Sequence, residues 1–193
     1  MNDVFATASE VQSFCELRNW RFCFIGGIAV HRWGEPRVTD DVDLTLLTGF
    51  GTEEPFSKEL CGHFRGRRPD SIEFALRNRV LLLVGSRGVN IDIALGAIPF
   101  EERAIERSTV WRAGGRHPLR TCSAEDLITH KCFAGRENDW SDVQGILVRQ
   151  WGKLNLDQVR RELQPLLELK GHTESLARFE TMIQKQRKAT DNC

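Results

Sequence analysis

The residues with the clearest capacity for chemistry are three aspartates on two predicted strands. The segment DVDLTLL at 41–47 alternates polar and apolar residues, so Asp41 and Asp43 share one strand face and the apolar residues share the other. In NIDIALG at 90–96, Asp92 interrupts an apolar run, and a carboxylate in such a strand is costly unless it is paired. If the two strands are neighbours, the three carboxylates converge.

Converging carboxylates need a cation or a shared proton. Two unit charges about 4 Å apart repel by about 4 kcal/mol at an effective dielectric near 20. Hard divalent cations take oxygen ligands, and magnesium commonly combines one or two carboxylates with substrate phosphates. The pattern favours a Mg²⁺ site, with Mn²⁺ as an alternative, at Asp41, Asp43 and Asp92. Each motif also has a simpler explanation when it is taken alone. The D-x-D pair could lie at a solvated strand edge, and Asp40 points to the other face. Asp92 could form an ion pair with Arg87.

A glycine pair lies between a predicted strand at 21–25 and a short predicted helix at 28–33. Gly26 and Gly27 lack Cβ atoms, so the backbone there can approach a ligand closely. The start of the following helix offers unpaired N–H groups and a positive dipole end to a phosphate. Tight packing explains most such pairs, and the position just before the carboxylate strand is what favours a nucleotide site.

The elements that must position these residues mix strands and helices in the first two thirds of the chain and are all helical in the last third. Strands are predicted at 21–25, 41–47, 80–85 and 90–96, with a short strand pair within 111–120, and helices at 8–19 (after a capping box at 7–10), 28–33, 53–62, 99–108, 123–135, 139–151, 155–170 and 173–188. Pro165 is expected to kink or break its helix. This pattern predicts an α/β (α+β) fold: a mixed β-sheet of four or five strands flanked by helices at 1–121, and a C-terminal helical region at 122–193 packed on it.

Composition bounds the class of partner. The 27 basic and 27 acidic residues balance, so the whole chain has no electrostatic footprint for nucleic acid. The basic residues at 65–68 could steer a phosphate or form a solvated loop. No apolar stretch is long enough to span a membrane and the N-terminus lacks signal-peptide features, so we expect a cytoplasmic protein without a membrane partner. The six cysteines match no zinc framework and are expected to be reduced thiols, several of them buried.

Taken together, these motifs resemble the DNA polymerase beta-type nucleotidyltransferase superfamily. The resemblance rests on FIGGIAVHRWGEPRVTDDVDL at 24–44 followed by NIDIAL at 90–95, which match a Gly-Gly or Gly-Ser step, a D-x-D strand and a third acidic residue on a later strand. The segment DLITHKCFAGRENDWSDV at 126–143 is similar to the helical motif of the abortive-infection toxin-type and minimal nucleotidyltransferase branches. The match spans about residues 22–150 and implies a nucleotidyltransferase core for the sheet domain.

The resemblance also implies roles for particular residues. Asp41 and Asp43 would be the metal-binding pair. Asp92 would be the third carboxylate, either a metal ligand or the base that acts on the attacking hydroxyl. Both possibilities stay open at this point.

Nucleotide binding would involve Gly26, Gly27, Arg37, Thr39 and Lys131, with the glycines against the phosphates and the lysine on the triphosphate. The residues themselves leave alternatives open. Arg37 could contact a phosphate or pair with Asp40, Thr39 could cap a turn, and Lys131 could reach water from the apolar side of its helix. Asp139 and Asp142 share a helix face, where an ion pair with Arg136 is as plausible as a catalytic role.

The implied activity is Mg²⁺-dependent transfer of a nucleoside monophosphate from an NTP to a hydroxyl of an RNA, a protein or a small molecule. The rival function is a non-catalytic relative that binds a nucleotide, or that forms a toxin–antitoxin-like pair with a cognate antitoxin protein. Small-molecule modification of the kind performed by aminoglycoside nucleotidyltransferases is the third option. A non-catalytic binder would not need all three carboxylates, so their presence favours an enzyme.

Overall fold

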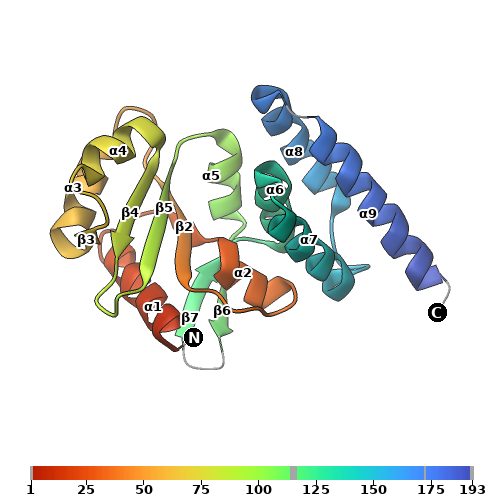
Figure 1. Ribbon diagram of the computed structural model, residues 1–193, viewed down its shortest axis with the longest axis horizontal. Coiled ribbons are helices and arrows are strands. Elements are labelled where there is room, and N and C mark those ends of the chain that lie inside the picture. Colours follow the sequence, from red (N-terminus) through yellow and green to blue (C-terminus); the bar gives the residue numbers. More distant parts are fainter. Residues whose placement is uncertain (1, 114–116, 172, 192–193) are drawn as a thin grey trace. The chain divides into compact units, whose positions relative to one another are not determined.

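The computed structural model describes residues 2–113, 117–171 and 173–191, and the chain forms two compact units (Figure 1). The first unit contains Met1–Ala29 and Arg37–Cys122, and the second contains Val30–Pro36 and Ser123–Cys193. The described strands all belong to the first unit, and the second unit is helical.

The described part of the first unit contains a seven-stranded mixed sheet with the order β3-β4-β5-β2-β1-β7-β6. The strands are β1 (Phe22–Phe24), β2 (Asp41–Leu47), β3 (Arg65–Gly66), β4 (Val80–Val84), β5 (Asn90–Gly96), β6 (Thr109–Ala113) and β7 (His117–Thr121). The β2–β5 and β1–β7 pairs are parallel, and the other neighbours are antiparallel. The predicted fold class is confirmed, but the expected four or five strands were too few. The two-residue edge strand β3 is too short to show an alternation of polar and apolar residues in the sequence. The predicted short strand pair corresponds to β6 and β7, and it belongs to the same sheet because β7 pairs with β1.

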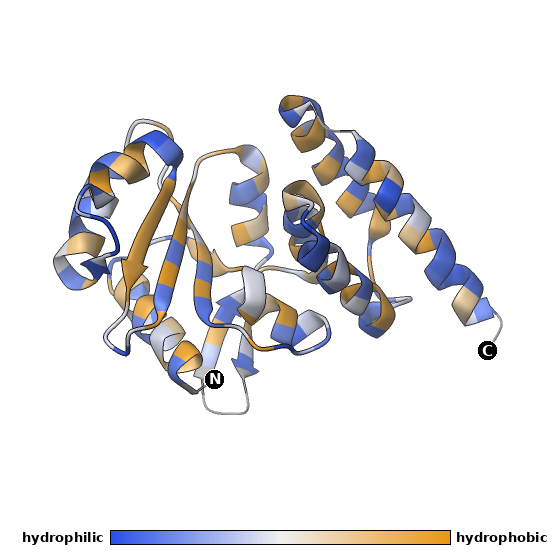
Figure 2. Cartoon of the chain, viewed as in Figure 1, coloured by the Kyte–Doolittle hydropathy of each residue, from blue (hydrophilic) through white to orange (hydrophobic). Residues whose placement is uncertain are grey.

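One face of this sheet carries the hydrophobic core. The helices of the first unit are α1 (Asn2–Glu16), α3 (Glu53–His63), α4 (Ser71–Asn78) and α5 (Pro99–Glu106), and α2 (Gly26–Trp33) begins in this unit. Apolar residues from alternate positions of β2, β4 and β5 pack with residues of α1, α3 and α4 in one buried cluster. The alternation is visible along β5 in Figure 2. The polar positions of β2 and β5 therefore point away from this core.

The first helix starts earlier than its sequence signal. Helix α1 begins at Asn2, so the predicted capping box at 7–10 lies inside the helix. The Ser9 hydroxyl donates to the Phe5 carbonyl oxygen at 3.0 Å, and Thr7 is fully buried. Because Val4 also joins the core, tertiary packing extends the helix upstream of residue 8.

The second unit contains the rest of α2 and the helices α6 (Ala124–Ala134), α7 (Glu137–Gln150), α8 (Leu156–Lys170) and α9 (Glu174–Asp191). Helix α6 matches its prediction: the Ser123 hydroxyl accepts from the Asp126 N–H at 3.1 Å, and Gly135 ends the helix with a φ of 73°. Helix α8 is not broken at Pro165, because buried leucines on both sides of the proline pack within the unit.

The thiols behave as expected within the described residues. Cys15, Cys23, Cys61, Cys122 and Cys132 form no disulfide, and all except Cys61 are buried; Cys193 lies outside the described residues. Burial raises the pKa of Cys15 to about 12, so this thiol stays protonated at neutral pH. In the described ranges, no helix is both long enough and apolar enough to cross a membrane.

Candidate active site

Strands β2 and β5 bring the three aspartates of the sequence analysis to one polar surface. The two strands are parallel neighbours, and their register places Asp43 opposite Asp92 and Asp41 opposite Asn90. These side chains share the face away from the core, because the alternate residues of both strands are fully buried on the other face. All three aspartates are partly exposed, so a ligand can reach them.

Two of these carboxylates are each held by one hydrogen bond. The Asn90 side-chain amide donates to Asp41 Oδ1 at 3.0 Å, and Arg67 Nη2 donates to Asp92 Oδ1 at 2.5 Å. Within the described residues, Oδ2 of Asp41 and Oδ2 of Asp92 accept no hydrogen bond. Each carboxylate is therefore oriented by one oxygen and offers the other to a ligand.

Arg67 was not identified as a site residue by the sequence analysis. Its backbone N–H donates to the Leu82 carbonyl at 3.0 Å, which extends the pairing of β3 with β4 by one residue. Leu82 in turn pairs with Asp92, so Arg67, Leu82, Asp92 and Asp43 form one cross-strand row. The partner of Asp92 is therefore Arg67 and not Arg87, and Arg67 does not lie in a solvated loop, since its side chain is only 25% exposed.

The electrostatics of the row disfavour the ionised form of Asp92. Burial is the main cause of its raised pKa. Arg67 opposes this rise, whereas the negative charges of Asp43 and Asp41 add to it. The ion pair with Arg67 therefore does not fully offset the burial of Asp92.

The donor set of this surface fits a hard divalent cation. Among the described residues, no three Asp, Glu, His or Cys side chains are already gathered as a metal cluster, so the carboxylates would have to rotate toward an ion. Neighbouring strands lie about 4.8 Å apart, which leaves carboxylates on opposed residues within reach of one ion. Carboxylate oxygens are the ligands that Mg²⁺ and Mn²⁺ prefer. Asp41, Asp43 and Asp92 could therefore hold such an ion.

The two glycines pack against site residues. Gly26 has a φ of 54°, and a Cβ there would lie 2.1 Å from Asp43 Oδ2 and 2.7 Å from Asp43 Cβ. A Cβ on Gly27 would lie 2.2 Å from Thr39 Oγ1. The space beside both glycines is thus filled by the protein's own side chains. The absent Cβ atoms let the first turn of α2 close over Asp43 and Thr39.

We expect Gly26→Ala to lower both stability and any activity of this site. The left-handed φ costs about 1–2 kcal/mol for a residue with a Cβ, and crowding against Asp43 adds about 1–3 kcal/mol. Gly51→Ala is the matched control, because Gly51 has a φ of 76° but nothing within 4 Å of its Cβ position. Urea denaturation should show a larger loss for Gly26→Ala. Equal losses would mean that Asp43 does not require the glycine.

The other nucleotide-binding candidates of the first unit are Arg37 and Thr39, which lie just before β2. Arg37 is exposed, and its guanidinium donates to the Val38 carbonyl oxygen at 3.2 Å. Thr39 is buried against Gly27, and its hydroxyl donates to the Asp41 carbonyl oxygen at 3.4 Å. Thr39 therefore supports the start of β2, and Arg37 lies on the surface just before it.

Lys131 lies in the second unit, where its charge is already balanced. Its ammonium contacts Asp139 Oδ1 at 2.9 Å and Asp142 Oδ2 at 2.8 Å, and the three side chains are almost fully buried. Arg136 also pairs with Asp139, at 2.7 Å, as one alternative of the sequence analysis expected. Burial alone would raise the pKa of Asp139, but hydrogen bonds from Arg136 and Lys131 hold it below its ordinary value. The geometry supports a structural ion-pair cluster rather than a phosphate contact.

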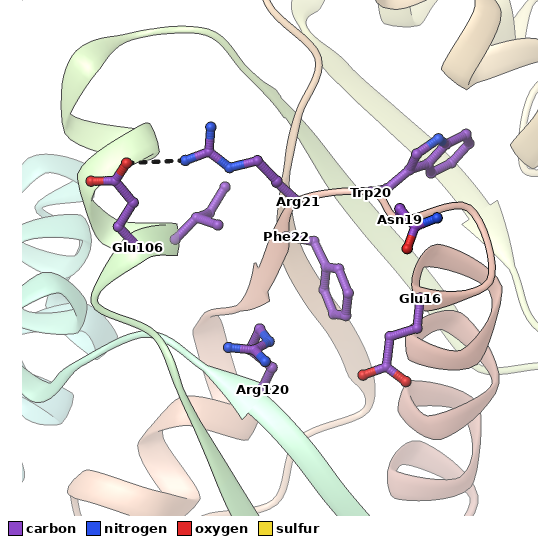
Figure 3. A pocket seen from close by; sticks show the side chains of 8 residues that line it. Glu16, Asn19, Trp20, Arg21, Phe22, Glu106 and Arg120 are labelled. Atoms are coloured by element: carbon purple, nitrogen blue, oxygen red, sulfur yellow. Dashed lines mark hydrogen bonds and ion pairs between the residues drawn. The ribbon is translucent and has the colours of Figure 1, made fainter.

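A separate hollow of about 390 Å³ lies at the other end of β1 (Figure 3). Arg21 in its wall donates to Glu102 at 2.9 Å and to Glu106 at 3.2 Å. Phe22, which also lines the hollow, pairs with Leu46, so the hollow lies at the opposite end of β2 from the aspartates. Because of this position, the hollow is not part of the candidate site.

Comparison with known proteins places the fold. No family model matches the sequence, and no curated protein resembles it significantly. An antigenic nucleotidyltransferase-like protein from Paracoccidioides brasiliensis matches with a TM-score of 0.54 and 14% identity, covering 93% of this chain and 92% of that one. The antibiotic-resistance factor ANT(2'')-Ia matches with a TM-score of 0.53 and 16% identity, covering 86% of this chain and 92% of that one. The chain therefore has a nucleotidyltransferase-like fold. Neither neighbour is described as an abortive-infection toxin, and that branch stays a prediction.

Proposed function

We propose that the protein is a Mg²⁺-dependent nucleotidyltransferase, which moves a nucleoside monophosphate from an NTP to a hydroxyl of an RNA, a protein or a small molecule. The observation that carries the proposal is the pairing of Asp43 with Asp92 across two parallel strands, with Asp41 two residues earlier on the same face. This arrangement lies in a nucleotidyltransferase-like fold, which raises the expectation of this chemistry without determining it.

The reaction exchanges one phosphorus–oxygen bond for another. The acceptor oxygen bonds to the α-phosphorus, the bond from that phosphorus to the bridging oxygen breaks, and pyrophosphate leaves. Bound Mg²⁺ would supply Lewis-acid stabilisation of the phosphate charge. Asp41 and Asp43 would hold the ion through carboxylate oxygens, and the amide of Asn90 keeps Asp41 oriented for that role.

The acceptor hydroxyl must lose its proton as it attacks. Asp92 is the candidate base, because its Oδ2 accepts no hydrogen bond from the described residues and its raised pKa suits proton transfer. Arg67 fixes the orientation of this carboxylate through Oδ1. The backbone amides at the start of α2, at Gly26 and Gly27, would meet the phosphates, since first-turn N–H groups have no partner within a helix.

Metal removal distinguishes this proposal from a non-catalytic nucleotide binder. Each α-³²P-labelled NTP is incubated with the protein, Mg²⁺ and separate pools of total RNA, cell proteins and small hydroxylated molecules. We expect label transfer to one pool, loss of transfer with excess EDTA, and recovery when excess Mg²⁺ or Mn²⁺ is restored. Nucleotide binding without transfer to any pool would instead favour the binder or a toxin–antitoxin-like partner.

A further inference from the structure

Two arginines at the β3 edge of the sheet lie on the same face as the three aspartates. Arg65 pairs with Val84 in the antiparallel register of β3 and β4, and Arg67 follows opposite Leu82. Opposed residues of neighbouring strands point to one face, as do residues two apart on a single strand. Because Leu82 pairs with Asp92, both arginines point to the polar face of the sheet.

The two arginines meet different residues across β4. In the row of Arg67, strand β5 supplies Asp92, and their ion pair at 2.5 Å shows that an arginine at this edge reaches over β4. In the row of Arg65, strand β5 supplies Asn90 instead, because Val84 pairs with Asn90. The side chain of Asn90 is an uncharged amide. This row therefore gives Arg65 no carboxylate on the two neighbouring strands.

Arg65 is consequently an exposed cation whose side chain has no ion pair or hydrogen bond within the described part of the chain. The other arginines of the basic run are paired, Arg67 with Asp92 and Arg68 with Asp70 at 2.9 Å. A guanidinium without an internal partner is well suited to bind a phosphate, because its planar fork of donors matches the phosphate oxygens.

The strand order places Arg65 on one particular side of the candidate active site. In the order β3-β4-β5-β2-β1, the proposed base Asp92 lies on β5, whereas Gly26 follows β1 and packs against Asp43 on β2. The phosphates of the nucleotide would therefore lie toward β1. In an in-line displacement, the attacking oxygen and the leaving pyrophosphate are on opposite sides of the α-phosphorus. The acceptor would thus approach Asp92 from the side of β4 and β3, where Arg65 lies.

We propose that Arg65 binds a phosphate of the acceptor, so that the acceptor is a phosphate-bearing molecule, either a polynucleotide or a phosphorylated small molecule. Arg65 is then a specificity-determining residue, since it contacts the acceptor away from the reacting hydroxyl. The inference rests on the proposed function and narrows its class of acceptor.

The test compares acceptors that carry the same hydroxyl with and without a phosphate. A short mixed-sequence single-stranded RNA, the nucleoside 5′-monophosphates and the matching nucleosides are offered separately with the labelled NTP that gives transfer. We expect transfer to the RNA or to the monophosphates to exceed transfer to the nucleosides. In Arg65→Met, the KM for the favoured acceptor should rise about tenfold, while kcat and the KM for the NTP stay within about twofold of the wild type.

Two further variants control for charge and for position. Arg65→Lys keeps a positive charge but loses the planar fork, and its acceptor KM should stay within about threefold of the wild type. Arg112→Met removes an exposed arginine from β6, at the opposite edge of the same sheet, and should leave the acceptor KM unchanged.

A second measurement does not require catalysis. Where RNA is the favoured acceptor, binding of the same RNA with a fluorescent label is followed by anisotropy at several salt concentrations. The slope of log affinity against log salt should become shallower by about 0.7 in Arg65→Met, as expected for the loss of one phosphate contact with a single strand. A purely structural role for Arg65 would not change this slope.

The outcomes separate this inference from the proposed function. An unchanged acceptor KM in a folded, active Arg65→Met would overturn the inference alone, and so would a rise confined to the KM for the NTP. Transfer only to proteins or to molecules without a phosphate would also overturn it and leave the proposed function in place. Absence of transfer from the wild type to every acceptor would overturn the two together.

Discussion

Asp43→Asn should reduce nucleotidyl transfer by about 10²- to 10³-fold while the protein stays folded. The substitution keeps the shape of the side chain and removes one of the charges that would hold the metal ion, and losing such an electrostatic contribution typically costs about 3–4 kcal/mol of transition-state stabilisation. The change also removes a like-charge contact, because Asp43 faces Asp92 in the register. Initial rates of label transfer and thermal unfolding measure the two effects.

The neighbouring carboxylate provides the control. Asp40 is exposed, and the structure gives its side chain no contact with Asp41, Asp43 or Asp92. Asp40→Asn therefore makes the same change of charge three residues away from Asp43. We expect its transfer rate to stay within about twofold of the wild type. Equal losses in both variants would indicate a general field effect, and full activity in Asp43→Asn would remove this residue from the catalytic centre.

The alternation of β2 and β5 was sufficient to predict which aspartates share a face. Both strands occur at the predicted residues, 41–47 and 90–96, because each places buried aliphatic residues at every second position. Their adjacency was only a condition in the sequence argument, since strand order depends on long-range pairing. The register that sets Asp43 against Asp92 could be read only from the structure.

Arg67 illustrates what a periodicity argument cannot reach. It follows a two-residue strand with no measurable pattern, at the edge of the sheet and two strands away from Asp92. Only the order β3-β4-β5-β2 shows that an arginine there can extend over one strand to the carboxylates. In the sequence, Arg67 belongs only to the basic run at 65–68, and such runs usually form a solvated surface.

Gly26 was found by its sequence position, but its packing role was not predicted. The sequence argument placed a ligand beside the missing Cβ, and the structure places the Asp43 carboxylate there. Both explanations require a glycine, so the residue type alone could not separate them. The positive φ at Gly26 is a second requirement that only the backbone reveals.

Lys131→Met should destabilise the helical second unit by about 3–5 kcal/mol. The lysine side chain is 8% exposed and contacts two carboxylates that are 2% and 3% exposed. Removing one member of a buried ion-pair cluster leaves uncompensated charge, and that penalty exceeds what the intact cluster contributes. Lys153→Met, at an exposed lysine of the same unit, should change the free energy of unfolding by less than about 0.5 kcal/mol.

Acid should weaken this cluster in the wild type. The lowered pKa of Asp139 means that its stabilisation is present above the unfolded-state pKa and is lost as pH falls through the folded-state pKa. Because Lys131 is one cause of that lowering, the variant should lose less stability on acidification than the wild type does. Urea denaturation at several pH values, followed by two spectroscopic probes in case the units unfold separately, measures both effects.

The same variant discriminates between the two roles considered for Lys131. A phosphate contact predicts a raised KM for the NTP with little change in the free energy of unfolding. A structural cluster predicts the reverse, and it also predicts rescue: adding Asp139→Asn and Asp142→Asn to Lys131→Met removes the stranded charges and should restore much of the lost stability. If the triple variant is no more stable than Lys131→Met, the buried charges are not what the lysine balances.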